Sequence, residues 1–333
     1  MGKAIGGKTL DIRGLEELKV ELAERVREAY ILAIDKIKSG ELQKEPQFDD
    51  LRITSSGVEI EGSILMGSEP LDAIDYVEER AGTRVAGPEL FNYIVEGKTL
   101  REDLFGLHSS LEEVIQGIHN TLNPISRAAQ ELGAELFILG GIPTFNPQVW
   151  EKYLTQRQRY QTLNEILSVN SRTIEPRFRD NTTLNVEKGM VWEGFTSLQT
   201  TIKVPYSSIP FYHDAALILG PMMAAVSTAT PFVDGKLTEN DSNRLHILPL
   251  ASYGHSEEDF QAGRPSRWRM MAPTTTPREL RMWADKELYN QLLMKGLHKG
   301  MARYCAEAAG EGPLIVTYEE RDEEKILQKD PIF

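Results

Sequence analysis

The strand-like and helix-like segments of this 333-residue chain do not alternate, which argues against a doubly wound parallel sheet. Polar and apolar residues alternate in GVEIEGSIL, residues 57–65, and predict a strand. Further strands are expected at 91–95, 135–139 and 195–204, and an apolar stripe over 111–132 predicts a long amphipathic helix. We therefore expect an α+β fold with helices packed on one side of an antiparallel sheet.

Other segments complete this outline. Helical periodicity recurs in four more places, at residues 11–38, 150–169, 211–228 and 278–309. The tail, 318–333, is charged, and we expect it to be loosely held. Because no linker-like composition interrupts the chain, we predict one domain over residues 1–333, with a helical extension at about 1–50.

Charge narrows the classes of partner. Lys and Arg number 37 against 50 Asp and Glu, for a net charge of -13, and such a surface repels nucleic-acid phosphates and anionic lipid. The longest apolar stretch, 215–226, is shorter than a bilayer span and contains Pro221. With one cysteine and no signal-like segment at residues 1–10, we expect a cytoplasmic protein with no nucleic-acid or membrane partner.

Most common catalytic motifs are missing from the sequence. It contains no G-x-G-x-x-G fingerprint, no G-x-S-x-G nucleophile elbow and no H-E-x-x-H zinc motif. Residues 2–9, GKAIGGKT, match the pattern G-x-x-x-x-G-K-[ST], but they do not follow a predicted strand, as a phosphate loop does. Cys305 lies in a helical pattern, where a small buried apolar residue is the favoured interpretation over a nucleophile. Hydrolase and dehydrogenase classes therefore find no support.

Two glutamates on the first predicted strand carry the strongest chemical signal. Glu59 and Glu61 are two residues apart, so their side chains point to the same face of the sheet. Such carboxylates repel one another unless a cation lies between them or water solvates them. Mg²⁺ prefers oxygen ligands of this kind and brings nucleotide phosphates with it. Glu89 and Glu96 flank the second predicted strand, and a metal-bearing face and a solvated strand face are both open interpretations.

Motif order adds a family resemblance. GVEIEGSIL is followed by PELFNYIVEGKT, ELGAELFILGGIPTF, QRQRY, FTSLQTTIKVP and AAVSTATPFVDGKLTENDSNRLHI. This order, over roughly residues 55–300, resembles the glutamate–cysteine ligase family, which includes bacterial carboxylate–amine ligases and plant-type enzymes. The last segment is the most specific part, with six residues in the expected order: Pro231, Phe232, Gly235, Lys236, Ser242 and Arg244.

The resemblance implies a fold and a reaction. The fold would be an antiparallel sheet funnel of glutamine synthetase type with helices on its outer face, forming a single catalytic domain. The reaction would be that of an ATP-dependent carbon–nitrogen ligase. ATP phosphorylates a substrate carboxylate, and an amine displaces phosphate from the acyl phosphate to form an amide, of which a γ-glutamyl bond is one example. The implied cofactors are ATP and Mg²⁺, and the partners are a small amino acid and an amine.

Residue roles follow from the same resemblance. The metal ligands would be Glu59, Glu61 and Glu96. The nucleotide would contact Gln199, Thr201, Arg244 and Lys236, of which the last two would also be catalytic. The substrate would contact Arg157, Arg159 and Glu89, although a solvated helix face is an equal alternative for the two arginines.

Departures from the family pattern leave an alternative open. Gln199–Thr201 has no His–x–His counterpart, which favours the plant-type comparison. PSRWRMMAP has Arg267 and Arg269 but no acidic residue near Trp268, where the family commonly has one. A catalytically silent relative that binds nucleotide or an amino acid as a sensor or scaffold is therefore the second hypothesis. A kinase-like phosphotransferase is the third, and a homo-oligomer is compatible with all three.

Overall fold

The computed structural model of the chain divides into two compact units, and each is described by itself. The first comprises residues 1–3, 52–203 and 226–253, and the second comprises 4–51, 204–225 and 254–333. The structure describes residues 8–9, 19–40, 55–99, 110–146, 150–157, 160–161, 164, 177–184, 194–227, 230–245, 273–275, 279–311, 317–321 and 324–327. A single catalytic domain over the whole chain remains a prediction.

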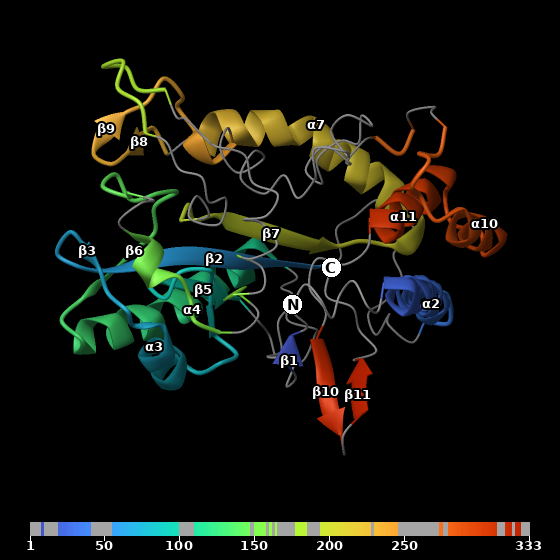
Figure 1. The fold of residues 1–333 in the computed structure, drawn as a ribbon, viewed down its shortest axis with the longest axis horizontal. Helices are drawn as coiled ribbons and strands as arrows, with labels where there is room; N and C mark the ends of the chain where they lie inside the picture. Colours follow the sequence, from blue (N-terminus) through green and yellow to red (C-terminus); the bar gives the residue numbers. More distant parts are fainter. Residues whose placement is uncertain are drawn as a thin grey trace. The chain divides into compact units, whose positions relative to one another are not determined.

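The first unit is built on an antiparallel sheet (Figure 1). Its elements are β2 (Ser55–Met66), β3 (Glu69–Pro70), α3 (Ile74–Ala81), β4 (Ala86–Pro88), β5 (Ile94–Lys98), α4 (Leu111–Glu131), β6 (Glu135–Phe137), a 3₁₀ turn (Glu151–Tyr153), β7 (Leu198–Lys203), β8 (Phe232–Val233) and β9 (Lys236–Leu237). Strand β2 pairs with β3, β5, β6 and β7, and β4 pairs with β5. The unit therefore has a mixed helix and sheet fold with a curled antiparallel sheet, as expected.

Helix α4 covers one face of this sheet. Val58 and Ile60 of β2 pack with Val114 of α4, and Ile125 of the same helix is fully buried in the neighbouring cluster. A Cβ at Gly97 would lie 2.8 Å from the Thr121 side chain, so glycine at this point of β5 lets the helix approach closely. Because side chains alternate along β2, the glutamates between these apolar residues are directed to the opposite face.

One predicted strand is displaced. We expected a strand at 91–95, but the paired strand is β5, Ile94–Lys98, and Phe91 forms only an isolated bridge with Leu154. Phe91 and Tyr93 are fully buried in an aromatic cluster in which Tyr93 packs edge-on against Trp150. Burial of these rings, and not strand pairing, produces the apolar run at 91–95. Glu96 consequently lies inside the strand and not beyond its end.

The helix predicted at 150–169 is wrong over the part that the structure describes between 151 and 157. Residues Glu151–Tyr153 form a 3₁₀ turn and Leu154 is extended. Leu154, Trp150 and Tyr153 contribute to the same aromatic cluster, so their spacing reflects burial in a loop. Trp150, Tyr160, Gln161 and Asn164 are helical, and the rest of the predicted helix lies outside the described residues.

The second unit is mainly helical. Its elements are β1 (Lys8–Thr9), α2 (Lys19–Lys38), a 3₁₀ turn (Tyr206–Ser208), most of α7 (Ile209–Ser227), α10 (Lys286–Met294), α11 (Lys299–Glu311), β10 (Thr317–Arg321) and β11 (Glu324–Leu327). Val26 of α2, Leu288 and Leu292 of α10, and Ala302 of α11 share a buried cluster. The segment 278–309, which we expected to be mostly helical with allowance for Gly296 and Gly300, forms the two helices α10 and α11, and Gly296 with φ +77° lies between them. The charged tail contains the paired strands β10 and β11, contrary to our expectation of a loose segment.

Helix α7 confirms the helix predicted at 211–228, and it is an exposed helix. None of its residues is buried, and Ile218 and Met222 are more than 60% exposed. The segment Tyr206–Ser227 is long and apolar enough to cross a membrane by length and composition alone, with a mean hydropathy of 1.3. The cytoplasmic location and the lack of a membrane partner stay predictions.

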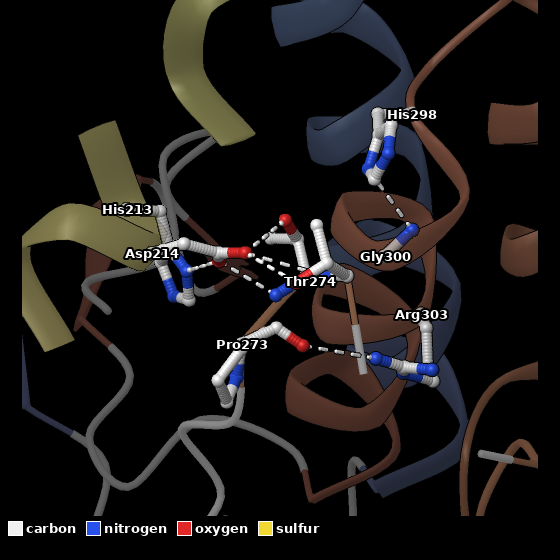
Figure 2. Close-up of polar contacts among 8 residues, drawn as sticks. His213, Asp214, Pro273, Thr274, His298, Gly300 and Arg303 are labelled. Carbon is white, nitrogen blue, oxygen red and sulfur yellow. Dashed lines mark hydrogen bonds and ion pairs between the residues drawn. The ribbon is translucent and has the colours of Figure 1, made fainter. Parts of the chain in front are cut away.

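A carboxylate joins α7 to the segment at 273–275 within the second unit (Figure 2). Asp214 accepts hydrogen bonds from the backbone N–H and the hydroxyl of Thr274, at 2.6 and 3.0 Å, and from the N–H and hydroxyl of Thr275. His213 Nδ1 lies 3.1 Å from the same carboxylate. Burial alone would raise the pKa of Asp214, but these donors outweigh it and hold the pKa well below its ordinary value.

We expect Asp214→Asn to lower the melting temperature at pH 7 by about 2–6 °C, because an amide cannot accept from all of these donors. Since the folded-state pKa is depressed, the carboxylate stabilises the fold above the ordinary pKa of about 3.9, and that stabilisation is lost as pH falls below it. The difference between the two proteins should therefore shrink below about pH 4. Calorimetry from pH 3 to 8 measures this. Asp72→Asn, at an exposed site, is the matched control, and an equal loss there would contradict the assignment.

Candidate functional site

Polar side chains share the face of the sheet opposite α4. In the antiparallel register Glu61 lies opposite Glu96, and Glu59 lies between Lys98 on one neighbour and Gln199 on the other. Thr201 lies opposite Gly57, so it faces the same side. We call this set the acidic face: Glu59, Glu61, Glu96, Lys98, Gln199 and Thr201. The prediction that the two glutamates of β2 point the same way, with Gln199 and Thr201 beside them, is confirmed.

Glu61 is the most enclosed carboxylate of the acidic face. The residue is 9% exposed, and its carboxylate accepts hydrogen bonds from the backbone N–H of Ser197 at 2.6 Å and from the Gln199 amide at 2.9 Å. Desolvation raises the pKa of Glu61, while Arg244 and the two hydrogen-bond donors oppose that rise. A buried carboxylate of this kind favours an additional positive charge nearby.

Arg244 supplies part of that charge. Its guanidinium lies 3.9 Å from the Glu61 carboxylate and donates a hydrogen bond to the carbonyl of Phe195 at 2.6 Å. The fully buried Asn243 donates to the Thr230 carbonyl, and the Arg244 N–H donates to the Thr230 hydroxyl. These bonds fix the backbone at Ser242–Arg244 and direct the Arg244 side chain to the acidic face.

Lys98 is a functional candidate that the sequence analysis missed. Its ammonium lies 2.6 Å from the Glu96 carboxylate, and both side chains are largely buried, at 9% and 15% exposure. The signal was present in the sequence, because Lys98 is two residues after Glu96 and a strand places such residues on one face. Because we predicted the strand at 91–95, Lys98 lay outside it and was not recognised as a same-face neighbour of Glu96.

Lys236 is placed elsewhere in the unit. It lies on β9, next to a tight turn in which Asp234 and Gly235 both have positive φ. Its ammonium donates to the Thr182 hydroxyl at 3.1 Å and lies 3.9 Å from Asp180. These contacts do not join it to the acidic face, so its nucleotide-binding and catalytic roles stay predictions.

The proposed substrate residues Arg157 and Glu89 also lie in different surroundings. Arg157 forms ion pairs with Asp75 and Glu78 of α3, at 2.7 and 2.6 Å. The Glu89 carbonyl accepts a hydrogen bond from Thr155, next to a cavity of about 310 Å³ that Thr155 helps to line. The ion pairs favour a structural role for Arg157, whereas Arg159 lies outside the described residues.

The acidic face fits a divalent cation in part. Glu59 and Glu61 provide hard oxygen donors on adjacent same-face positions, and Mg²⁺ is commonly held by one or two carboxylates together with substrate phosphates. Glu96, however, is already paired with Lys98. Within the described ranges, no three Asp, Glu, His or Cys side chains come together in a group that could hold a metal ion.

Cys305 offers no competing nucleophile. It is buried in the helical cluster of the second unit, and burial raises the pKa of its thiol to about 12. The thiol is therefore protonated near neutral pH and unreactive. The interpretation as a small buried apolar residue is confirmed.

Comparison with known proteins assigns the class. Residues 56–271 match the family model described as glutamate-cysteine ligase family 2 (GCS2). The match covers more than half of the chain and includes every residue of the acidic face, so the chain belongs to this family of ligases. No curated protein matches the chain significantly.

Proposed function

We propose that this chain is an ATP-dependent carboxylate–amine ligase that joins an amino-acid carboxylate, such as the γ-carboxylate of glutamate, to an amine. In this proposal the curled sheet forms the floor of a funnel of glutamine synthetase type. The supporting observation is the buried Glu61 carboxylate, which accepts a hydrogen bond from Gln199 and lies 3.9 Å from Arg244. The strand register places Glu59 and Glu96 on the same face of the sheet. Phosphoryl transfer depends on positioning and charge neutralisation, which are what such a face supplies.

The reaction balances without a further reactant. A carboxylate oxygen of the acid attacks the γ-phosphorus of ATP, and ADP leaves with the electrons of the broken P–O bond. The amine nitrogen then attacks the acyl carbon, inorganic phosphate leaves with its bridging oxygen, and the nitrogen loses a proton to water. The products are therefore one ADP, one phosphate and one amide for each ATP consumed.

The chain's own residues have separable roles in this proposal. Glu59 and Glu61 would hold Mg²⁺, which would supply charge neutralisation at the nucleotide phosphates. Arg244 would bind phosphate oxygens, because its guanidinium is only half-enclosed and is already directed to the acidic face by its bond to Phe195. Gln199 would orient the Glu61 carboxylate through the amide bond that it donates.

Nucleotide turnover tests the proposal. We expect the full-length chain, incubated with ATP, Mg²⁺ and a panel of amino acids and amines, to release ADP and phosphate in equal amounts with an amide product. ATP with Mg²⁺ at 100 times the dissociation constant should stabilise the fold by about 2.7 kcal/mol, measurable as a rise in melting temperature. A failure to form ADP with any pair in the panel would count against a ligase.

The same experiment separates the two alternatives. Binding of ATP without Mg²⁺ dependence and without ADP release would indicate a silent relative that acts as a sensor or scaffold. A stable phosphorylated acid in place of an amide would indicate a phosphotransferase. Both results leave the family membership unchanged, because that rests on the match over residues 56–271.

A further inference from the structure

Lys98 is placed among the carboxylates of the acidic face by the strand register. It lies directly opposite Glu59, and its neighbour on the same face, Glu96, lies opposite Glu61. Residues opposite one another in an antiparallel pair, and residues two apart on one strand, have side chains within reach of each other. By register, Lys98, Glu96, Glu59 and Glu61 therefore occupy neighbouring positions on one face of the sheet, and the Lys98 ammonium is paired with Glu96.

The site of Lys98 is built to hold a buried ammonium. Its carbonyl accepts a hydrogen bond from the Thr121 hydroxyl of α4 at 3.0 Å, which fixes the backbone at the end of β5. Gly87 of β4 lies opposite Glu96, and a Cβ there would be 3.0 Å from the Lys98 nitrogen and 3.6 Å from a Glu96 oxygen. Glycine at this position leaves the space that the ion pair occupies.

A divalent cation at Glu96 would compete with the Lys98 ammonium for the same carboxylate. The ammonium lies 2.6 Å from a Glu96 oxygen, in an enclosed place where charges interact strongly. A second cation bound to Glu96 would lie within a few ångströms of this ammonium, and their repulsion would oppose binding. Arg244 lies near Glu61, as Lys98 does near Glu96. When all five groups are ionised, Glu59, Glu61 and Glu96 together with these two cations carry a net charge of one negative unit.

We propose that Lys98 is a built-in cation of the acidic face, which neutralises Glu96 in place of a divalent metal ion and confines metal binding to Glu59 and Glu61. The inference rests on the proposed function in so far as that function assigns metal to this face. It also revises the ligand set, since Glu96 then binds Lys98 and not the metal. Removing the ammonium while keeping the carboxylate would create an additional metal site.

Mn²⁺ binding without nucleotide tests this proposal, with electron paramagnetic resonance and titration calorimetry as readouts. The proteins are the full-length wild type, Lys98→Met, the double variant Lys98→Met/Glu96→Gln, and Glu59→Gln. We expect Lys98→Met to bind one more Mn²⁺ than the wild type, and the double variant, in which the pair is replaced by neutral groups of similar size, to return to the wild-type number. Glu59→Gln should weaken wild-type binding about 10-fold or more.

Two results would overturn the proposal. The first is a Lys98→Met protein that binds no more Mn²⁺ than the wild type. The second is a double variant that binds Mn²⁺ as weakly as Glu59→Gln, because Glu96 would then be a ligand in its own right. The double variant removes both charges of the Lys98–Glu96 pair, so neither is left buried without the other. The second result can therefore be obtained even where Lys98→Met alone fails to fold.

The ligase proposal and the role of Lys98 can fail independently of each other. If the wild type binds Mn²⁺ in the predicted pattern but releases no ADP with any acid and amine, the ligase proposal fails and the role of Lys98 stands. If ADP and amide form but the double variant loses the metal, the role of Lys98 fails and the ligase proposal stands.

Discussion

Glu61→Gln is expected to lower the rate of ADP formation about 100-fold or more, because Glu61 would hold the Mg²⁺ that neutralises transition-state charge, and the loss of one neutralising group commonly costs this much. The substitution keeps the shape of the side chain but removes the negative charge that faces Arg244 at 3.9 Å. It also removes one oxygen acceptor, so the Ser197 N–H or the Gln199 amide must find another partner.

The same substitution should change the stability of the folded protein only slightly. Desolvation raises the pKa of Glu61, which means that the native state favours the neutral carboxyl group and that ionisation weakens the fold as pH rises through the ordinary range near 4.3. A neutral glutamine avoids this penalty but loses one acceptor for the Ser197 N–H and the Gln199 amide, so the two effects oppose each other. The melting temperature of the metal-free variant at pH 7 should therefore stay within about 3 °C of that of the wild type. Loss of activity with retained stability is the pattern expected of a site residue.

A matched control separates charge loss from general damage to the sheet. Glu69 is an exposed glutamate on β3 of the same sheet, and Glu69→Gln should change neither turnover nor melting temperature measurably. Steady-state kinetics and scanning calorimetry on the three proteins give both quantities. Wild-type turnover in Glu61→Gln, or an equal loss in Glu69→Gln, would remove Glu61 from the site.

Gly300→Ala is expected to destabilise the second unit severely, by about 3 kcal/mol or more, at the upper end of what overpacking costs. A Cβ at this position would overlap the carbonyl oxygen and carbon of Thr274, which are backbone atoms and cannot rotate away (Figure 2). Thr274 cannot shift easily either, because its N–H is bound to Asp214 at 2.6 Å. Alanine normally favours a helix over glycine by about 1 kcal/mol, so this clash reverses the usual sign.

Gly220→Ala is the matched control for this prediction. Gly220 lies inside α7, and a Cβ there would meet nothing within 4 Å. The substitution should leave the free energy of unfolding unchanged or raise it by up to about 1 kcal/mol. Urea denaturation of the two variants gives both values. A stable Gly300→Ala protein would mean that α11 and the segment at 273–275 do not pack as the structure has them.

Local patterns predicted the regular elements of the chain well. The alternation in GVEIEGSIL identified β2, and the apolar stripe over 111–132 identified α4, which ends one residue earlier, at Glu131. Alternation also placed Glu59 and Glu61 on one face, because the period of two is a property of the strand itself. The family resemblance, now supported by the match over residues 56–271, came from motif order alone.

Partners from distant parts of the chain account for what the patterns missed. The apolar run at 91–95 was assigned to a strand because burial among Trp150 and Phe145 produces the same composition as strand pairing. The pairing of Arg157 with α3 and the bond from Arg244 to Phe195 depend on which elements lie side by side, whereas the ion pair of Lys98 with Glu96 lies within one strand. Spacing along the chain specifies the face on which a charge lies, whereas the charge that neutralises it is chosen by packing between segments, where burial makes each unpaired ion costly.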